Sequence, residues 1–123
     1  MIELRELIQA ELEKVSARVY YQVAPESATY PYIVFEIPSL TDDGEYLQYF
    51  NLEIDGWDTP SDGSTSALEI LMRSINDTIN KAVLSTSDRS IVLFLKTKLT
   101  LTDPDTRIKR RKYIYDGRYY ERS

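Results

Sequence analysis

Residues 46–57 read YLQYFNLEIDGW, a stretch in which apolar and polar side chains alternate. The even positions are mostly apolar and the odd positions between them polar: Tyr46, Phe50, Leu52 and Ile54 against Asn51, Glu53 and Asp55. Because successive side chains of a β-strand point to opposite faces, this alternation predicts a strand with one buried face and one wet face. The buried face needs a second layer of structure to cover it.

Two segments with helical periodicity can supply that layer. Residues 2–16 carry apolar side chains three or four positions apart, with acidic side chains between them, which is typical of an amphipathic helix. A second helix is expected from Ser66 to about Leu84, and Ser66 and Glu69 are spaced as in a capping box at its start. The two apolar stripes are Leu4, Leu7, Ile8, Leu12 and Val15, and Leu68, Leu71, Met72, Ile75, Ile79, Ala82 and Val83.

Further strands are expected at residues 18–23, 32–37, 91–101 and 107–115. The strand at 91–101 is expected to line one face with its aliphatic side chains, Ile91, Leu93, Leu95, Leu99 and Leu101. The order α-β-β-β-α-β-β, with short connections, predicts a single α+β domain over residues 1–123. Its sheet is expected to be mostly antiparallel, with about four to five strands and both helices packed on one face.

The strand expected at residues 107–115 is strongly basic. Residues 107–123 hold seven Lys and Arg against two Asp and Glu, although the whole chain has a net charge of −5. A buried central strand tolerates such charge only when every cation is paired. The strand is therefore expected at an edge of the sheet or as a projecting arm.

A basic strand and an acidic body offer two complementary surfaces, which favours head-to-tail contacts between copies of the chain. Exposed ion pairs contribute about 0.2–1 kcal/mol each, so charge would orient the copies while tyrosines supply adhesion. An equal alternative is an edge strand whose charges only prevent pairing with other strands. In a further alternative, residues 107–112 belong to a nucleic-acid-binding module. The candidate interface residues are Arg107, Lys109, Arg110, Arg111, Lys112, Tyr113, Tyr115, Asp42, Asp43 and Glu45.

The residue types that most catalysis needs are missing. The sequence holds no His and no Cys, which removes the commonest general base, the commonest metal ligand and thiolate chemistry. A metal-dependent enzyme would have to gather Asp55, Asp58 and Asp103. We therefore expect no enzyme, cofactor, metal or small-molecule substrate. No signal peptide or membrane span is evident, so a cytoplasmic protein without a membrane partner is expected.

Several features follow one another along the chain: the initial helix, Arg18-Val19-Tyr20, the strand Tyr30-Pro31-Tyr32-Ile33-Val34-Phe35, the strand ending in Trp57-Asp58, the helix from Ser66-Ala67 to Ala82, and the turn Asp103-Pro104-Asp105 before a final strand. In this order they resemble the tail terminator (tail completion, or head-to-tail joining) proteins of long-tailed bacteriophages and prophages. The basic final strand has no counterpart in this resemblance.

The resemblance implies a structural protein that forms a hexameric ring at the head-proximal end of the tail tube. Such a ring ends tube polymerisation and joins the tail to the head. The implied partners are copies of the chain itself, the tail-tube protein and a head-completion or connector protein. The implied location is the virion tail, and the host bacterial cytoplasm during assembly.

Overall fold

The computed structural model describes residues 2–42 and 47–121. These residues form the elements α1 (Ile2–Glu13), β1 (Val19–Tyr21), β2 (Tyr32–Asp42), β3 (Leu47–Asp58), α2 (Ser66–Ile79), β4 (Val83–Ser85), β5 (Arg89–Thr102) and β6 (Lys109–Glu121). Asp43, Glu45 and Tyr46 lie outside the described residues, so what was expected of them stays a prediction.

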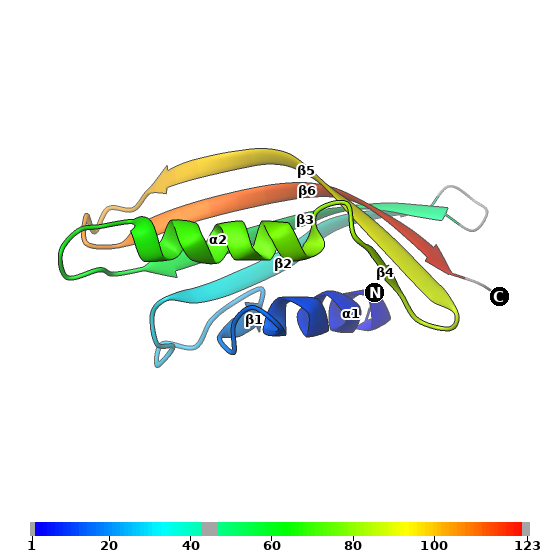
Figure 1. Cartoon of the computed structure of the whole chain (residues 1–123), viewed down its shortest axis with the longest axis horizontal. Coiled ribbons are helices and arrows are strands. Elements are labelled where there is room, and N and C mark those ends of the chain that lie inside the picture. The colour runs from blue at the N-terminus through cyan, green and yellow to red at the C-terminus, as the bar shows by residue number, and fades with distance from the viewer. Residues whose placement is uncertain (1, 43–46, 122–123) are drawn as a thin grey trace.

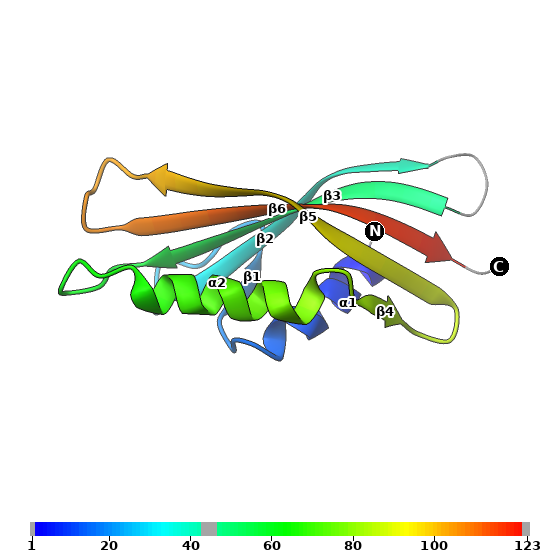
Figure 2. The ribbon, with the colours of Figure 1, turned by 45° about the horizontal axis from the view of Figure 1, so that its top comes forward.

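All strands belong to one curved sheet in the order β1-β2-β3-β6-β5-β4 (Figure 1). β1 and β2 are parallel, and the other neighbouring strands are antiparallel. α1 and α2 lie on the same face of this sheet (Figure 2). The α+β class and the mostly antiparallel sheet are thus confirmed. The expected number of strands is wrong, because the described part of the chain forms a six-stranded sheet.

The additional strand, β4, comes from the segment that was expected to end the second helix. α2 ends at Ile79, and Lys81 has a φ of 63°, which turns the chain out of the helix. Val83 then pairs with Val92 of β5 and is exposed. The expected capping box is also wrong, since Thr65 precedes the helix without a side-chain cap and Glu69 pairs instead with Arg111.

The core lies between the helices and the face of the sheet that they cover. The alternation expected for β3 is confirmed, because Phe50, Leu52 and Ile54 are buried there. α1 contributes Leu4, Ile8 and Leu12, and α2 contributes Leu68, Met72, Ile75 and Ile79. Two glycines permit close packing in this core. A Cβ on Gly56 would lie 2.7 Å from the Met72 sulfur, and a Cβ on Gly117 would overlap the Phe50 ring.

A bulge in β5 divides the aliphatic side chains that were expected on one face. Leu95 is opposite Tyr115 and Thr97 is opposite Ile114, so one residue, Lys96, is extra in β5. An extra residue reverses the face to which each later side chain points. Ile91, Leu93 and Leu95 therefore face the helices, whereas Leu99 and Leu101 lie on the other face, opposite Lys112 and Arg110.

β6 is a central strand, and the expectation of an edge or a projecting arm is wrong. It pairs with β3 on one side and with β5 on the other. The sheet accepts this strand because its two faces differ. Tyr113, Tyr115 and Tyr119 point into the core, while Arg110 and Lys112 lie on the opposite face, where carboxylates of β3 pair with them.

Candidate interaction surface

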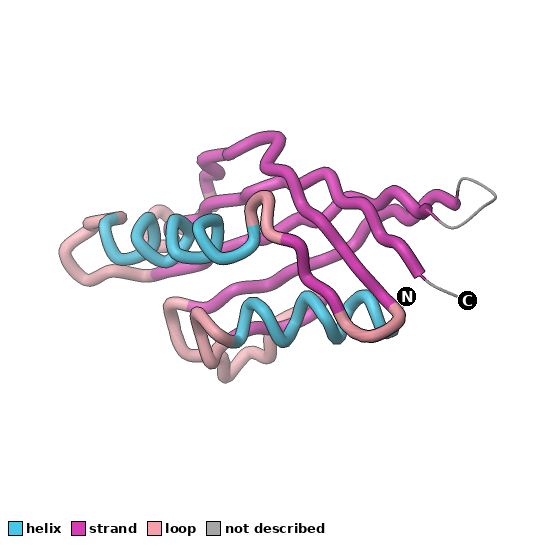
Figure 3. Tube along the Cα trace, turned by 45° about the vertical axis from the view of Figure 1, so that its right-hand side comes forward, coloured by secondary structure: helices cyan, strands magenta, loops and turns pink. Residues whose placement is uncertain are grey.

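The face of the sheet that points away from α1 and α2 is left uncovered by residues 2–42 and 47–121 (Figure 3). We call it the open face. It carries charged side chains in its centre, an aromatic cluster on β1, β2 and β3, and a second aromatic group around Tyr49 and Phe94. A surface of this composition suits protein contacts, in which aromatic and arginine side chains are enriched.

The centre of the open face is a network of ion pairs between β6 and β3. Lys112 Nζ lies 2.9 Å from Glu53 Oε1 and 3.6 Å from Asp55 Oδ2, and Arg110 Nη2 lies 3.5 Å from Asp55 Oδ1. Arg111 pairs with Glu69 of α2 at 3.1 Å, on the helix side. These cations are neutralised within the chain. Arg110, Arg111 and Lys112 therefore do not present the uncompensated positive charge on which binding to nucleic acid depends.

Burial and hydrogen bonding act differently on the partners in this network. Burial raises the pKa of Asp55 above its ordinary value, although Lys112 and Arg110 act in the opposite direction. The hydrogen bond to Glu53 raises the pKa of Lys112, which outweighs the effect of its burial. Lys112 interacts with two carboxylates, whereas Asp55 is the more desolvated partner. The fold thus favours the charged form of Lys112 and disfavours the charged form of Asp55.

An aromatic cluster borders this network at one end: Tyr20, Tyr30, Tyr32, Trp57 and the guanidinium of Arg110. The Arg110 guanidinium lies 3.9 Å from the centre of the Trp57 ring, and the Tyr32 ring is nearly parallel to Trp57 at 6.1 Å. Burial raises the pKa of Tyr32 to about 12, so its hydroxyl stays protonated. Three members of the cluster, Tyr32, Trp57 and Arg110, line a shallow pocket of about 330 Å³ together with residues 22–24, Val34 and Asp55.

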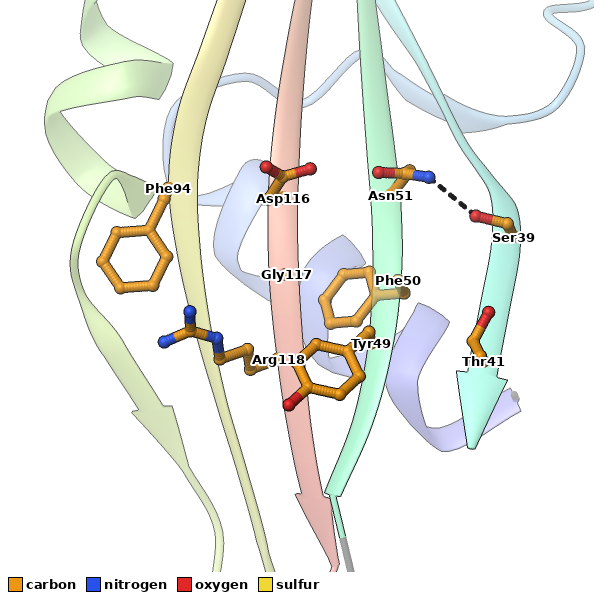
Figure 4. A pocket seen from close by; sticks show the side chains of 9 residues that line it. All are labelled: Ser39, Thr41, Tyr49, Phe50, Asn51, Phe94, Asp116, Gly117 and Arg118. Carbon is orange, nitrogen blue, oxygen red and sulfur yellow. Dashed lines mark hydrogen bonds between the residues drawn. The ribbon is translucent and has the colours of Figure 1, made fainter. Parts of the chain in front are cut away.

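A second shallow pocket, of about 350 Å³, lies on the open face toward the C-terminal half of β6 (Figure 4). Tyr49, Phe94 and Arg118 line it, with the Arg118 guanidinium 5.3 Å from the Phe94 ring centre. Asn51 closes one side and donates a hydrogen bond of 2.7 Å to Ser39 Oγ. The pocket has the character of a contact surface rather than of an enclosed ligand site.

A groove of about 470 Å³ lies on the helix side, between α2 and the ends of β5 and β6. Ile70 is exposed at this groove, and Arg73, Lys98 and Arg111 surround it with positive charge. Lys98 lies 5.2 Å from the centre of the Tyr113 ring. The groove therefore combines an apolar side chain with three cations and the single carboxylate of Glu69.

The structure separates the candidate interface residues into three groups. Tyr113 and Tyr115 belong to the core, where the Tyr115 hydroxyl donates to Asn76 Oδ1 at 2.8 Å, so their rings do not form an adhesive surface. Arg110, Arg111 and Lys112 are paired within the chain. The remaining described residues are Arg107, which pairs with Asp105 within the β5–β6 connection, Lys109 at the start of β6, and Asp42 at the end of β2.

Sequence reasoning missed the aromatic cluster, although a signal was present. Trp57 lies on the same face of β3 as Glu53 and Asp55, and Tyr32 is its direct partner in β2. Alternation in the two strands would therefore have placed both rings on the wet face. Large aromatic side chains on a wet face are the signal of a contact surface.

The described residues do not gather a metal-binding group. No set of three or more acidic side chains in residues 2–42 and 47–121 is close enough to hold an ion. Asp55 is instead held by Lys112 and Arg110, and Asp103 lies in the turn before β6, where its side chain accepts from the Asp105 backbone at 3.0 Å. Neither α1 nor α2 has the length and apolar character required to cross a bilayer.

Comparisons of the sequence with models of protein families and with curated proteins find no match. Among solved structures, the fold is similar to a chain from the virion of a native gene transfer agent (GTA) particle, with a TM-score of 0.72. The two chains are 13% identical, and the match covers 92% of this chain and 91% of the other. The likeness shows that the two chains share a fold over nearly their whole lengths.

Proposed function

We propose that this chain is a structural subunit of the tail of a phage-like particle. Six copies form a ring at the head-proximal end of the tail tube, end the polymerisation of the tube and join the tail to the head. The partners are copies of the same chain, the tube protein and the head-completion or connector protein. The protein acts in the virion tail after assembly in the bacterial cytoplasm, and it performs no catalysis.

The observation that carries this proposal is the shared fold with a chain of a gene transfer agent virion, which extends over 92% of the present chain. The sequence features described above resemble tail terminator proteins independently of that match. The composition of the surface is in keeping with both. Exposed or half-exposed aromatic and arginine side chains, such as Tyr49, Trp57 and Arg118, are placed as interface residues usually are.

A closed ring requires two different surfaces on each subunit, which contact each other in the next copy. The C-terminal end of β2 and the β5–β6 connection lie at opposite ends of the sheet (Figure 1). β2 ends with Asp42, which by sequence is followed by Asp43 and Glu45, whereas the β5–β6 connection holds Arg107 and β6 begins with Lys109. We propose these residues as contacts between neighbouring copies. Arg110, Arg111 and Lys112 contribute by holding the sheet surface on which such contacts form.

Removal of the gene from a particle-producing strain tests the proposal. A subunit that ends tube polymerisation leaves tubes without a stop when it is absent, so tubes longer than those of the wild type should accumulate next to filled, tailless heads. Electron micrographs provide the tube lengths. Expression of the intact chain from a plasmid should restore them.

A matched control is the same plasmid carrying Leu52→Asp, which places a charge in the core and removes the folded subunit. It should fail to restore tube length. Normal tube length with normal joining to heads in the deletion strain would contradict the proposed function.

A further inference from the structure

Two strands of the sheet have open outer edges within residues 2–42 and 47–121. β1 pairs with β2 only at residues 33–35. This pairing ends with the hydrogen bond that the Gln22 amide donates to the Phe35 carbonyl at 2.9 Å. β4 pairs with β5 only at residues 90–92. Further along the same outer edge, the Leu95 amide donates a hydrogen bond of 2.8 Å to Asn80 Oδ1. Beyond these contacts, no described strand pairs with β2 or β5 on the outer side.

The two open edges lie at opposite ends of the molecule, where β2 and β5 are the outermost strands (Figure 2). Each begins just after a bulge, which lies between Glu36 and Ser39 in β2 and between Leu95 and Thr97 in β5. After the bulges, residues 39–42 and 97–102 return to a regular ladder with the neighbouring inner strand. Both segments therefore keep a regular ladder on the inner side, while no described strand takes up their outward backbone groups, which another strand can bind.

The open edges carry opposite charge. Asp42 ends the β2 edge and is followed, by sequence, by Asp43 and Glu45 with no basic residue among them, whereas residues 96–102 contain two lysines and no acidic side chain. The groove between α2 and β5 adds Arg73 to the positive side, and exposed Ile70 offers an apolar contact beside the same edge. The β5 edge is thus built to receive a strand with acidic side chains, and the β2 edge of another copy is such a strand.

We propose that residues 97–102 of β5 pair with residues 39–42 of β2 from a second copy, so that neighbouring subunits join their sheets edge to edge. The inference rests on the proposed ring and names the contact that builds it. Within the chain, β5 runs antiparallel to β2, since three antiparallel pairings separate them. Copies that share one orientation around a ring therefore bring β5 and β2 together as an antiparallel pair, the pairing with the better hydrogen-bond geometry.

Charge also selects this pairing over two-fold dimers. A β5–β5 contact would bring Lys96 and Lys98 of two copies together, and a β2–β2 contact would do the same for acidic side chains. Like charges opposite each other on paired strands destabilise the pair. The β5–β2 contact avoids both repulsions and leaves one edge of each kind free at the ends of a growing chain of subunits. Only such a heterologous contact propagates until a ring closes.

Disulfide cross-linking tests the pairing directly, because the chain contains no Cys and introduced thiols are the only ones present. Thr41 lies on the open face of β2, and the same face of β5 holds Thr97, Leu99 and Leu101. T41C is mixed with T97C, L99C or L101C in separate samples under mild oxidation. One of the three mixtures, the one in register, should shift from monomer to a covalent heterodimer on non-reducing gels.

The matched control is T41C mixed with T100C. Thr100 is on the same strand but points to the helix side, opposite Arg111, so the two Cβ atoms cannot meet the geometry of a disulfide. The double variant that combines T41C with the in-register partner in one chain should form a ladder of covalent oligomers. Reduction should return every sample to the monomer.

The outcomes separate this inference from the proposed function. Rings without any cross-link above the T100C control would overturn the edge-to-edge contact and leave the ring intact. Cross-linked heterodimers in a protein that never closes a ring would support the contact and contradict the ring. The absence of both rings and cross-links would overturn both.

Discussion

The two faces of β6 show how one strand serves two environments. On the helix side, Tyr113, Tyr115 and Tyr119 are buried in the core. On the open face, Arg110 and Lys112 alternate with them and pair with the carboxylates of β3. The first face contributes stability through burial of apolar area, and the second presents a charged and aromatic surface. A basic strand can therefore be central when one face of its sheet remains accessible to water and to partners.

The difference between the two faces of the sheet is tested most strongly by truncating two neighbouring residues of β3, one on each face. Leu52→Ala removes a fully buried side chain from the helix side of β3 and should lower the free energy of unfolding by about 2–5 kcal/mol. Asn51→Ala, its neighbour on the open face, should change it by only about 0.5 kcal/mol. Chemical denaturation gives both values. Equal losses in the free energy of unfolding for the two variants would contradict the assignment of Asn51 to a solvent-exposed face.

The close contact between Gly117 and Phe50 provides a second test on the helix side. Gly117→Ala places a methyl group in the Phe50 ring and should cost about 1–3 kcal/mol through overpacking. Phe50→Leu in the same chain should recover part of this loss, because a smaller side chain leaves room for the methyl group. A double-mutant cycle by thermal and chemical unfolding measures the coupling. Additive losses would contradict the contact.

The hydrogen bond between Tyr115 and Asn76 sharpens the comparison between tyrosines of the two faces. Tyr115→Phe keeps the ring but leaves the Asn76 carbonyl without its 2.8 Å donor, which should cost about 1 kcal/mol. Tyr49→Phe removes a hydroxyl from the open face, where the ring is 46% exposed, and should leave unfolding unchanged. A larger change in the free energy of unfolding for Tyr49→Phe than for Tyr115→Phe would contradict the assignment of these tyrosines to the open face and the core.

The smallest expected effect concerns the ion pairs of the open face. Lys112→Met leaves Glu53 and Asp55 without their common cation and should cost about 0.5 kcal/mol at neutral pH. The pKa of Lys112 is raised in the fold, so its contribution is full below the ordinary lysine value and is lost as the pH rises through the raised pKa.

Acid should remove the difference between wild type and Lys112→Met as well. Burial raises the pKa of Asp55, so this carboxylate becomes protonated at a higher pH than an ordinary one and no longer needs the cation. Urea denaturation of both proteins across the acidic range measures the difference. An equal cost at neutral and acidic pH would mean that Lys112 acts through packing of its aliphatic stem instead of its charge.

The sequence was sufficient to predict what depends on local periodicity. The alternation of Phe50, Leu52 and Ile54 predicted the buried face of β3, and the helical stripes predicted α1 and α2, although both predicted helices extend past the observed ends. Features that depend on distant partners could not be predicted in this way. The basic side chains of β6 indicated that burial would be costly, but not that Glu53 and Asp55, which come from a much earlier strand, would offset the cost.

Single-residue irregularities were the other source of error. The residues around Lys96 continue to alternate through the bulge, so nothing in the pattern indicates that Leu99 and Leu101 change faces. β4 is a three-residue strand whose side chains also fit the end of a helical stripe. The aromatic cluster could have been predicted from Tyr32 and Trp57, but the edge contact that we propose could not, because it depends on the strand order of the sheet.

The most direct test of this account is the mass of the purified, full chain in solution, measured by native mass spectrometry and light scattering over a range of protein and salt concentrations. We predict monomers that convert to one closed ring of six copies, with less ring at high salt because the edges of β2 and β5 carry opposite charge. A protein that stays monomeric throughout, or that stops at a two-fold dimer, would contradict the account.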